Sequence, residues 1–213
     1  MPAAFKALRS PAFPKKKAKV SIMKNPIATI TMNSGRRIVL ELLPDYAYNE
    51  VCSFISAAQK GYFDHFAIQR IVPGSWIDVS YNAFFREECQ YFLPNELKEK
   101  KEIKIPELGD ICLGYYSADE VSGTEFFFPL RRAEELRDTC PVFGKVIEGV
   151  DELIRISEVE TYPNPSFDAF VKINHPKYPE VIVKVEVDTF GETYPEPRKL
   201  TPKKRPSVWP AFA

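Results

Sequence analysis

Nineteen prolines, against only nine glycines, are spread along the 213 residues of this chain and limit the folds that it can adopt. A proline inside a helix removes a backbone hydrogen bond and clashes with the preceding turn. The same residue is tolerated at strand edges, in turns and in extended segments. An all-helical fold is therefore excluded, and a fold of short strands and turns is favoured.

The charges of the chain balance, with 29 basic and 29 acidic residues. A chain without an excess of either sign produces no global field that would attract nucleic acid or an anionic membrane. Its apolar runs are all shorter than the roughly 18 residues that suggest a membrane-spanning helix. The sequence therefore predicts neither a nucleic-acid partner nor a membrane partner.

The four cysteines, Cys52, Cys89, Cys112 and Cys140, lie far apart and form no CxxC pair. An even number permits two disulfides, but a chain of this length can build a core without them. Free thiols that pack as small hydrophobic groups are the favoured interpretation. The first twenty residues lack the apolar stretch of a secretory signal, so we expect a cytoplasmic protein.

Composition divides the chain into three parts. Residues 1–22 contain six basic residues, three prolines and no acid. Such a segment buries little apolar surface, so it is interpreted as an N-terminal arm, either solvated or in contact with an acidic partner. Residues 191–213 are again basic and rich in proline, and are expected to form a C-terminal arm. The folded domain is expected over residues 23–190.

Short β-rich runs dominate the central part. Residues 27–32 and 36–42 flank a polar loop that ends in Gly35, which predicts a β-hairpin. Further strands are expected over residues 67–72, 75–79, 110–113, 125–129, 143–147 and 181–187. Residues 160–179, rich in proline and aromatic side chains, are expected to form a loop.

Two segments have the period of an amphipathic helix. From Val51 onward, apolar residues recur at i, i+3, i+4 and i+7, which predicts a helix over residues 49–60. Asn49 is its expected N-cap, and Gly61 follows its end. A second helix is expected over residues 149–158. Two helices among many short strands favour a closed β-barrel or a sandwich.

Motifs for metal, phosphate or covalent chemistry are missing from the sequence. His65 and His175 are the only histidines and are more than a hundred residues apart, so no zinc-binding spacing occurs. Neither a phosphate-binding glycine loop nor a GxSxG nucleophile elbow is present. No metal and no cofactor is predicted.

Three blocks nevertheless resemble the signatures of the cyclophilin family, in the family's order and spacing. They are Ile68–Gly74 (IQRIVPG), Ser122–Phe128 (SGTEFFF) and Pro141–Gly149 (PVFGKVIEG). The resemblance covers about residues 25–190. It implies a mainly β fold, a closed eight-stranded antiparallel β-barrel capped by two α-helices, which agrees with the elements expected above.

Cyclophilins are peptidyl-prolyl cis-trans isomerases, and the resemblance assigns Arg70 to their catalytic arginine and Phe127 to the floor of their proline pocket. Rotation about an Xaa–Pro bond is opposed by a barrier of roughly 18–20 kcal/mol from amide resonance. At the twisted transition state the prolyl nitrogen gains a lone pair, which an arginine donor stabilises. Because consecutive strand residues face opposite ways, Phe126 is expected in the core.

The same resemblance implies a substrate-binding surface in which several residues depart from the family's pattern. Where the family has Phe, Met and Gln, this chain has Ser75, Trp76 and Asp78, and Asp78 is positioned to pair with Arg70. Tyr115 and Tyr116 replace small residues. The full substrate-binding set comprises Ser75, Trp76, Asp78, Gly114, Tyr115, Glu125, Leu136 and Cys140.

Two functions follow from these matches and departures. The first is a monomeric isomerase that acts on proline-containing polypeptides during folding, slow or narrow in substrate. The alternative is a binding module for proline-containing peptides that has lost turnover. The arms could also mediate self-association, with the C-terminal residues Trp209-Pro210-Ala211-Phe212 filling a neighbour's groove.

Overall fold

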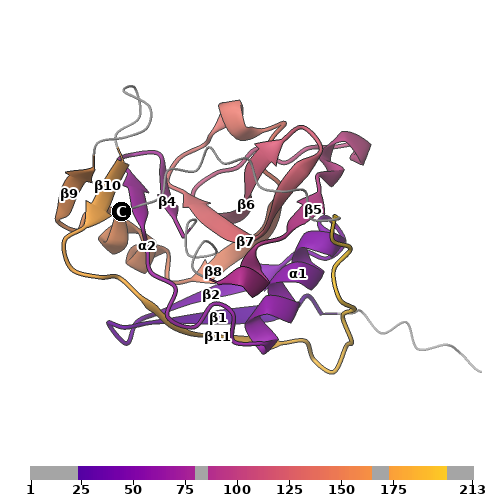
Figure 1. Cartoon of the computed structure of the whole chain (residues 1–213), viewed down its shortest axis with the longest axis horizontal. Helices are drawn as coiled ribbons and strands as arrows, with labels where there is room; N and C mark the ends of the chain where they lie inside the picture. The colour runs from indigo at the N-terminus through magenta and orange to yellow at the C-terminus, as the bar shows by residue number, and fades with distance from the viewer. Residues whose placement is uncertain (1–23, 80–85, 165–172, 201–213) are drawn as a thin grey trace, which may run out of the picture.

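One large antiparallel sheet curls around a hydrophobic core in the computed structural model, which describes residues 24–79, 86–164 and 173–200 (Figure 1). The strands run in the order β11-β1-β2-β8-β6-β7-β4-β3-β10-β9, and β5 pairs with β7. They are β1 (Ile27–Met32), β2 (Arg37–Leu42), β3 (Arg70–Val72), β4 (Trp76–Asp78), β5 (Phe92–Pro94), β6 (Asp110–Ser117), β7 (Glu120–Pro129), β8 (Val142–Glu148), β9 (Thr161–Asn164), β10 (Ile173–Pro176) and β11 (Ile182–Asp188).

The expected closed barrel of eight strands is not confirmed. In the described part of the chain the sheet has eleven strands, and its pairing order has two ends, at β11 and β9. The segment before β3 approaches the start of β11, where Ile68 N donates to Glu180 O at 2.8 Å and Ile182 N donates to Phe66 O at 2.7 Å. These bonds join two sides of the curled sheet without a continuous ladder between β3 and β11.

The predicted β-hairpin is confirmed. Strands β1 and β2 pair in register from Ile27–Glu41 to Thr31–Arg37, and Gly35 has a positive φ of 79° in the loop between them. Alternate residues of both strands are buried, so one face of the hairpin packs on the core.

Two α-helices pack on the sheet, α1 (Tyr48–Gln59) and α2 (Val150–Ser157), and short 3-10 helices occupy Glu87–Cys89 (η2), Glu96–Glu99 (η3) and Glu134–Leu136 (η4). Helix α1 packs against β7, β8 and β11, and α2 against β2 and β4. Gly61 follows α1 with a φ of 68°, as expected. The expected cap is wrong, because Ala47 occupies the N-cap and no side chain caps the helix. No helix in the described residues is long and apolar enough to cross a membrane.

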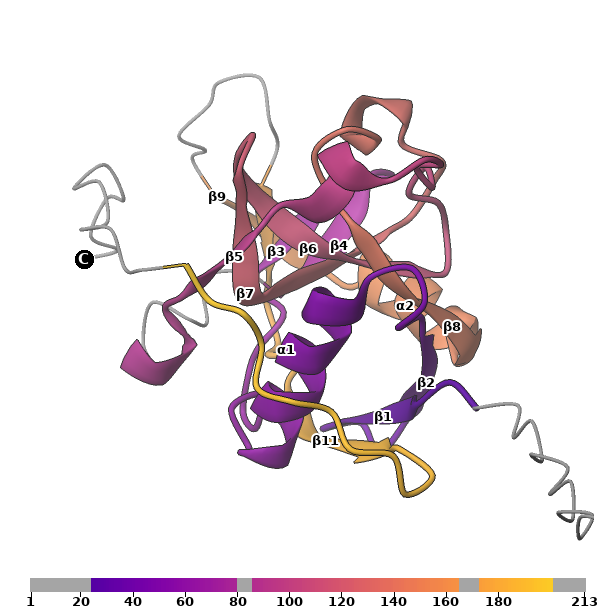
Figure 2. The same ribbon diagram turned by 90° about the vertical axis from the view of Figure 1, so that its right-hand side faces the viewer.

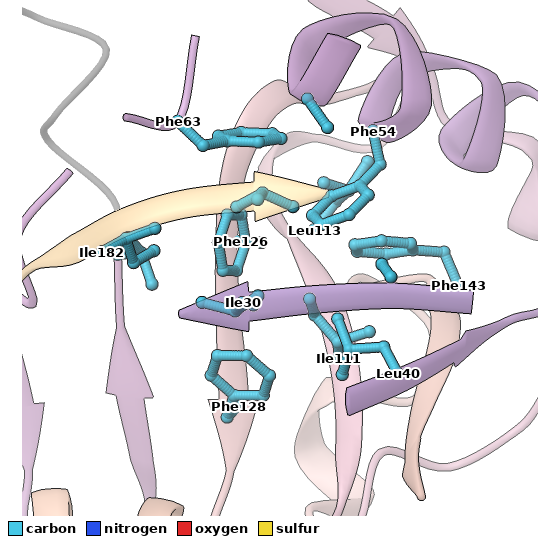
Figure 3. Packing of buried hydrophobic residues seen from close by; sticks show 14 of the residues in the cluster. Ile30, Leu40, Phe54, Phe63, Ile111, Leu113, Phe126, Phe128, Phe143 and Ile182 are labelled. Carbon is cyan, nitrogen blue, oxygen red and sulfur yellow. The ribbon is translucent and has the colours of Figure 1, made fainter. Parts of the chain in front are cut away.

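The core is rich in phenylalanine (Figure 3). The ring of Phe126 contacts those of Phe54 and Phe63, at centroid distances of 5.7 and 5.4 Å, and that of Phe128 at 5.8 Å. Tilted and edge-on contacts of this kind add to the free energy gained from burial alone. Helix α1 is thereby fixed against β7, the strand that also carries Phe127.

Residues 160–179 do not form only a loop, because β9 and β10 pair with each other there and β10 continues the sheet at β3. Residues 165–172 of that expected loop lie outside the described residues. The same holds for the predicted arm over residues 1–22 and for residues 201–213 of the other arm.

The described part of the C-terminal arm lies along the outside of α1 (Figure 2). We call residues 192–200 the C-terminal strap. The side chain of Asn49 forms a bracket around the backbone of this strap, with two hydrogen bonds to one residue. It donates to Arg198 O at 3.1 Å and accepts from Arg198 N at 2.7 Å. Leu200 N then donates to Phe92 O at 2.9 Å, so the strap ends beside β5.

Candidate active site

A row of side chains crosses the sheet on the face opposite the core. Arg70 on β3 pairs with Asp78 on β4, Asp78 pairs with Phe127 on β7, and Phe127 pairs with Cys112 on β6. Paired residues in adjacent strands point to the same face of a sheet, so these four side chains lie together. Their immediate neighbours Ile71, Ile77 and Phe126 point the other way, into the core.

The row borders a cavity of about 170 Å³. Strands β3, β4, β6 and β7 supply most of its wall, and the segment through η4 supplies the rest. The lining residues are Arg70, Trp76, Asp78, Gly114, Tyr115, Tyr116, Glu125, Phe127, Leu136 and Cys140. The structure thus brings together every residue assigned to the site from the sequence except Ser75.

Ser75 lies outside this lining because it belongs to a turn rather than to a strand. Its backbone N–H donates to Val72 O at 2.9 Å, and its carbonyl accepts from Leu130 N at 2.8 Å. Trp76 begins β4 and lies two residues before Asp78, so both side chains face the cavity. The ring of Trp76 lies 6.3 Å from that of Phe127, centroid to centroid.

Arg70 lies on the wall of the cavity and also contacts a carboxylate. Its Nη1 is 3.3 Å from Asp78 Oδ2, and its guanidinium carbon is 5.6 Å from the centre of the Trp76 ring. Both partners of the ion pair are largely buried, with side-chain exposures of 18% for Arg70 and 7% for Asp78. Arg70 Nε is buried and has no hydrogen-bond partner among the described residues. The guanidinium is therefore oriented by Asp78 and Trp76 and retains donor capacity.

Tyr116 lines the cavity although the site assigned from the sequence did not include it. Neighbouring residues of a regular strand face opposite ways, so only one of Tyr115 and Tyr116 would be expected there. The pairing of β6 with β7 shifts on both sides of Tyr115, and such an irregularity changes where side chains point. The hydroxyl of Tyr116 donates to Glu125 Oε2, and its ring lies 4.7 Å from that of Phe92.

The side of the cavity near Leu136 is apolar. Phe127, Cys112, Cys140 and Val142 form a small buried cluster, against which Trp76 and Leu136 pack. Burial raises the pKa of the Cys140 thiol to about 11, and burial also raises that of Cys112. Both thiols are therefore protonated at neutral pH, which makes them poor nucleophiles.

All four cysteines are free and buried, as expected from their spacing. Within residues 24–79, 86–164 and 173–200, no group of three or more His, Cys, Asp or Glu side chains could hold a metal ion. The polar side chains among the described lining residues include the Arg70–Asp78 pair, the Tyr116–Glu125 pair and Tyr115.

Comparisons with solved structures agree with this fold. A crystal structure of a cyclophilin type peptidyl-prolyl cis-trans isomerase from Cryptosporidium parvum superposes with a TM-score of 0.64 at 16% identity, covering 77% of this chain and 98% of that one. A second structure of that protein, in the presence of the dipeptide Ala-Pro, matches with a TM-score of 0.64 at 17% identity over 76% of this chain and 98% of that one. At these identities the likeness shows the fold alone.

Sequence comparisons identify the family. The chain is 26% identical to peptidyl-prolyl cis-trans isomerase CYP57 of Arabidopsis thaliana over 137 residues, which is 58% of this chain and 25% of that protein. It is 28% identical to peptidyl-prolyl cis-trans isomerase-like 2 of Cryptococcus neoformans over 144 residues, 64% of this chain and 24% of that one. The matches thus span about a quarter of these relatives. A family model described as cyclophilin type peptidyl-prolyl cis-trans isomerase/CLD matches residues 27–186. The chain therefore belongs to the cyclophilin-type peptidyl-prolyl cis-trans isomerase family.

Proposed function

We propose that the chain catalyses the cis-trans isomerisation of Xaa–Pro bonds, with Arg70 as the catalytic residue and Phe127 as the floor of the proline site. The observation that supports this proposal is that Arg70, Asp78 and Phe127 lie side by side on the wall of one cavity. A proline ring seated on Phe127 lies within the reach of the Arg70 guanidinium, which comes from two strands away. The Cryptosporidium protein, which shares this fold, was crystallised in the presence of the dipeptide Ala-Pro, and this supports a ligand of the same class.

The chemistry requires only one well-placed donor. In the planar isomers the prolyl nitrogen shares its electron pair with the carbonyl, and in the twisted state it recovers that pair. A hydrogen bond from Arg70 to this nitrogen therefore stabilises the transition state more than either ground state. Arg70 bonds Asp78 through Nη1, and because a guanidinium carries five N–H donors, others remain for the prolyl nitrogen.

Asp78 has two opposite effects on this mechanism. As an ion-pair partner it holds the guanidinium in place, and this saves the entropy of ordering a long side chain. As a negative charge it lowers the positive potential that Arg70 presents to the prolyl nitrogen. We therefore propose an isomerase that is slow or narrow in substrate. Its proposed setting is the cytoplasm, where a monomer acts on proline-containing segments of folding polypeptides.

Exchange spectroscopy on a short Ala-Pro peptide tests the proposal. The full chain is expected to accelerate cis-trans exchange, and Arg70→Ala to lose about 10- to 100-fold of that acceleration, as expected for one charge-assisted hydrogen bond. Arg37→Ala is the matched control, because Arg37 is an exposed strand arginine that does not line the cavity. No acceleration by the unaltered chain at high concentration would exclude catalysis.

The second candidate is a proline-peptide-binding module without turnover. It is favoured by the stacking of Arg70 on Trp76 and by its ion pair with Asp78, two contacts that also suit a purely structural arginine. Under this candidate, Arg70→Ala leaves peptide affinity nearly unchanged, and the unaltered chain binds Ala-Pro without accelerating exchange. Titration and exchange on the same samples separate the two functions.

A further inference from the structure

The C-terminal strap, residues 192–200, ends at a fixed point of the sheet. Leu200 N donates to Phe92 O at 2.9 Å, and the ammonium of Lys199 lies 3.7 Å from the centre of the Tyr91 ring. The strap lies beyond residue 186, where the match to the family model ends. Its course over α1 and its end beside β5 can be followed in Figure 2. The chain that follows Leu200 therefore starts from a defined place at the edge of β5.

This place is next to the cavity. Strand β5 pairs with β7, and Phe92 lies opposite Ser122. The ring of Phe92 lies 4.7 Å from that of Tyr116, which lines the cavity. One aromatic contact thus connects the strand on which the strap ends with the wall of the cavity.

The sheet gives the distance from the end of the strap to the proposed proline site. Ser122 and Phe127 are five residues apart on β7, which corresponds to about 17 Å along the strand. Leu200 is hydrogen-bonded to β5 and β5 is paired with β7, so two interstrand steps of about 4.8 Å separate Leu200 from β7. The distance from Leu200 to Phe127 is therefore about 20 Å.

Three prolines follow the strap, Pro202, Pro206 and Pro210. An extended chain spans about 3.3 Å per residue, so Pro202 lies within about 7 Å of Leu200 and cannot reach Phe127. Pro206 has about 20 Å available and reaches the site only along a straight path. Pro210 has about 33 Å available and reaches it with slack. It is the first proline after the strap that can enter the site without a fully extended path.

The residues around Pro210 suit the apolar side of the cavity. Trp209 precedes it, and Ala211 and Phe212 follow. On the cavity side, Phe127 belongs to a small buried apolar cluster on which Leu136 packs. Apolar side chains next to a proline gain free energy when they leave water for such a wall.

We infer that Trp209–Pro210 occupies the proposed proline site of its own chain, and that the strap is the tether that delivers it. A ligand held by a short linker is present at a millimolar effective concentration, so even a weak ligand competes with free substrate. The segment is therefore an autoinhibitory ligand. This inference rests on the proposed function, because it takes the proline site over Phe127 as given, and it adds a regulation of that site.

The test is a titration of the full chain with the blocked peptide Ala-Ala-Pro-Ala-Ala, followed by NMR chemical shifts of the cavity residues. Pro210→Ala removes the ring of the tethered competitor, so the apparent affinity for the added peptide is expected to rise about three- to tenfold. Pro202→Ala is the matched control, because it removes a proline that cannot reach the site, and it is expected to bind like the unaltered chain. Equal affinities for all three chains overturn the inference.

A nitroxide label on Ala213→Cys tests the position of the segment directly. The four native cysteines are buried, so the label attaches to the new thiol. It is expected to broaden the resonances of Trp76 and Tyr116 more than those of Val183, which is exposed on β11 and outside the cavity lining. Equal broadening at these positions contradicts the inference.

A mixed sample separates the chain's own segment from that of a second copy. It combines a nitroxide-labelled chain without isotope label and an isotope-labelled chain without nitroxide. No broadening is expected in this mixture, because the segment enters the cavity of its own chain. Broadening of the cavity resonances would place the segment in a second copy and overturn the intramolecular assignment.

These outcomes are distinct from failure of the proposed function. If the added peptide shifts no cavity resonance in any of the three chains, the proline site itself is wrong and the inference falls with it. If the peptide binds all three chains alike, only the inference about Pro210 fails. If Pro210→Ala binds the peptide more tightly but no chain accelerates exchange, the inference stands and catalysis fails.

Discussion

Glu50, in the first turn of α1, is fully buried, and neither of its carboxylate oxygens has a hydrogen-bond partner among the described residues. Burial raises its pKa from 4.5 to about 7. The nearby Glu96 adds to this effect, whereas the backbone N–H of Glu50 and the charges of Lys100 and Arg198 oppose it. The carboxyl group is thus largely protonated in the folded state below neutral pH and becomes a buried charge above it.

A carboxyl group with a raised pKa in the folded state destabilises the protein as the pH rises. Its contribution to stability is fully present below about pH 4.5, the ordinary value, and is lost as the pH rises through about 7. The shift corresponds to about 3 kcal/mol. Glu50→Gln is therefore expected to be more stable than the unaltered chain at pH 8, by up to this amount, and little different near pH 4.5.

Urea unfolding at pH 4.5 and at pH 8 measures this difference. Glu152→Gln is the control, because Glu152 is equally buried but bonds to Arg155 at 2.7 Å, and its loss is expected to destabilise the protein at pH 8. Parallel pH dependences for the unaltered chain and Glu50→Gln would contradict the assignment of this titration to Glu50.

Single residues of the site were predictable wherever strand alternation determines direction. Arg70 and Phe127 could be placed because each lies in a strand within a recognisable block, and Asp78 because it stands where the family's pattern continues after the first block. The direction of the Ser75 side chain could not be predicted in this way. Ser75 belongs to a turn immediately before β4, and the geometry of the turn, not strand alternation, determines where its side chain points. Tyr116 was missed because the irregular pairing of β6, which depends on its neighbour β7, leaves no mark in the sequence of β6.

Asn49 shows that a local sequence pattern can also mislead about where a helix is capped. Its position before an amphipathic segment is typical of an N-cap, yet its side-chain amide bonds instead to the backbone of Arg198, 149 residues further along the chain. The strap is fixed at further points by Glu196, which contacts Lys60 at 2.7 Å, and by Arg198, which contacts Glu96 at 2.8 Å. A local pattern cannot show that a distant segment will compete for the same side chain.

Removal of this bracket is expected to loosen the strap without unfolding the sheet. Asn49→Ala loses two hydrogen bonds to the backbone of Arg198, which together contribute about 1–3 kcal/mol. Hydrogen exchange is expected to show faster exchange at the amides of Arg198 and Leu200, while the strands keep their protection. Unchanged exchange in the strap would mean that the remaining contacts hold it.

Asn33→Ala is a matched comparison for that experiment. Asn33 brackets another segment in the same way, donating to Pro179 O at 2.9 Å and accepting from Val181 N at 3.0 Å. Its loss is expected to expose the amide of Val181 and to leave Arg198 protected. Each asparagine therefore serves as the control for the other.

The hairpin and both helices follow from periodicity, whereas strands β5, β9 and β10 do not. The hairpin and both helices were predicted to within a few residues because each contains enough positions to show a period of two or of 3.6. Strands β5, β9 and β10 have three or four residues, too few to show alternation, and β9 contains Pro163. They form because β7 and β3 offer partners that are distant in sequence.

Across the whole molecule, stability and ligand binding are assigned to opposite faces of the same strands. On β7, Phe126 and Phe128 pack into the core and Phe127 faces the cavity, so three successive aromatic residues serve two purposes. Helix α1 and the core phenylalanines thus determine the position of the strand on which the site depends. The resemblance to cyclophilins predicted this division, because it assigned only Phe127 to the pocket.

The two phenylalanines are therefore expected to respond differently to truncation. Phe126→Ala leaves a cavity among the rings of Phe54, Phe63 and Phe128, which is expected to cost about 3–5 kcal/mol of stability. Phe127→Ala enlarges a hollow that is already open to solvent, so its cost in stability is smaller, but it removes the proposed floor of the proline site. Affinity for an Ala-Pro peptide is expected to fall by tenfold or more in Phe127→Ala, since burial of the ring against a ligand is worth about 1.5–3 kcal/mol.

Urea unfolding and peptide titration on both variants test this division between the two faces of β7, and equal losses of stability would contradict it. So would a loss of affinity in folded Phe126→Ala as large as that in Phe127→Ala, because the site would then depend on the packing of the core rather than on its own face of the strand.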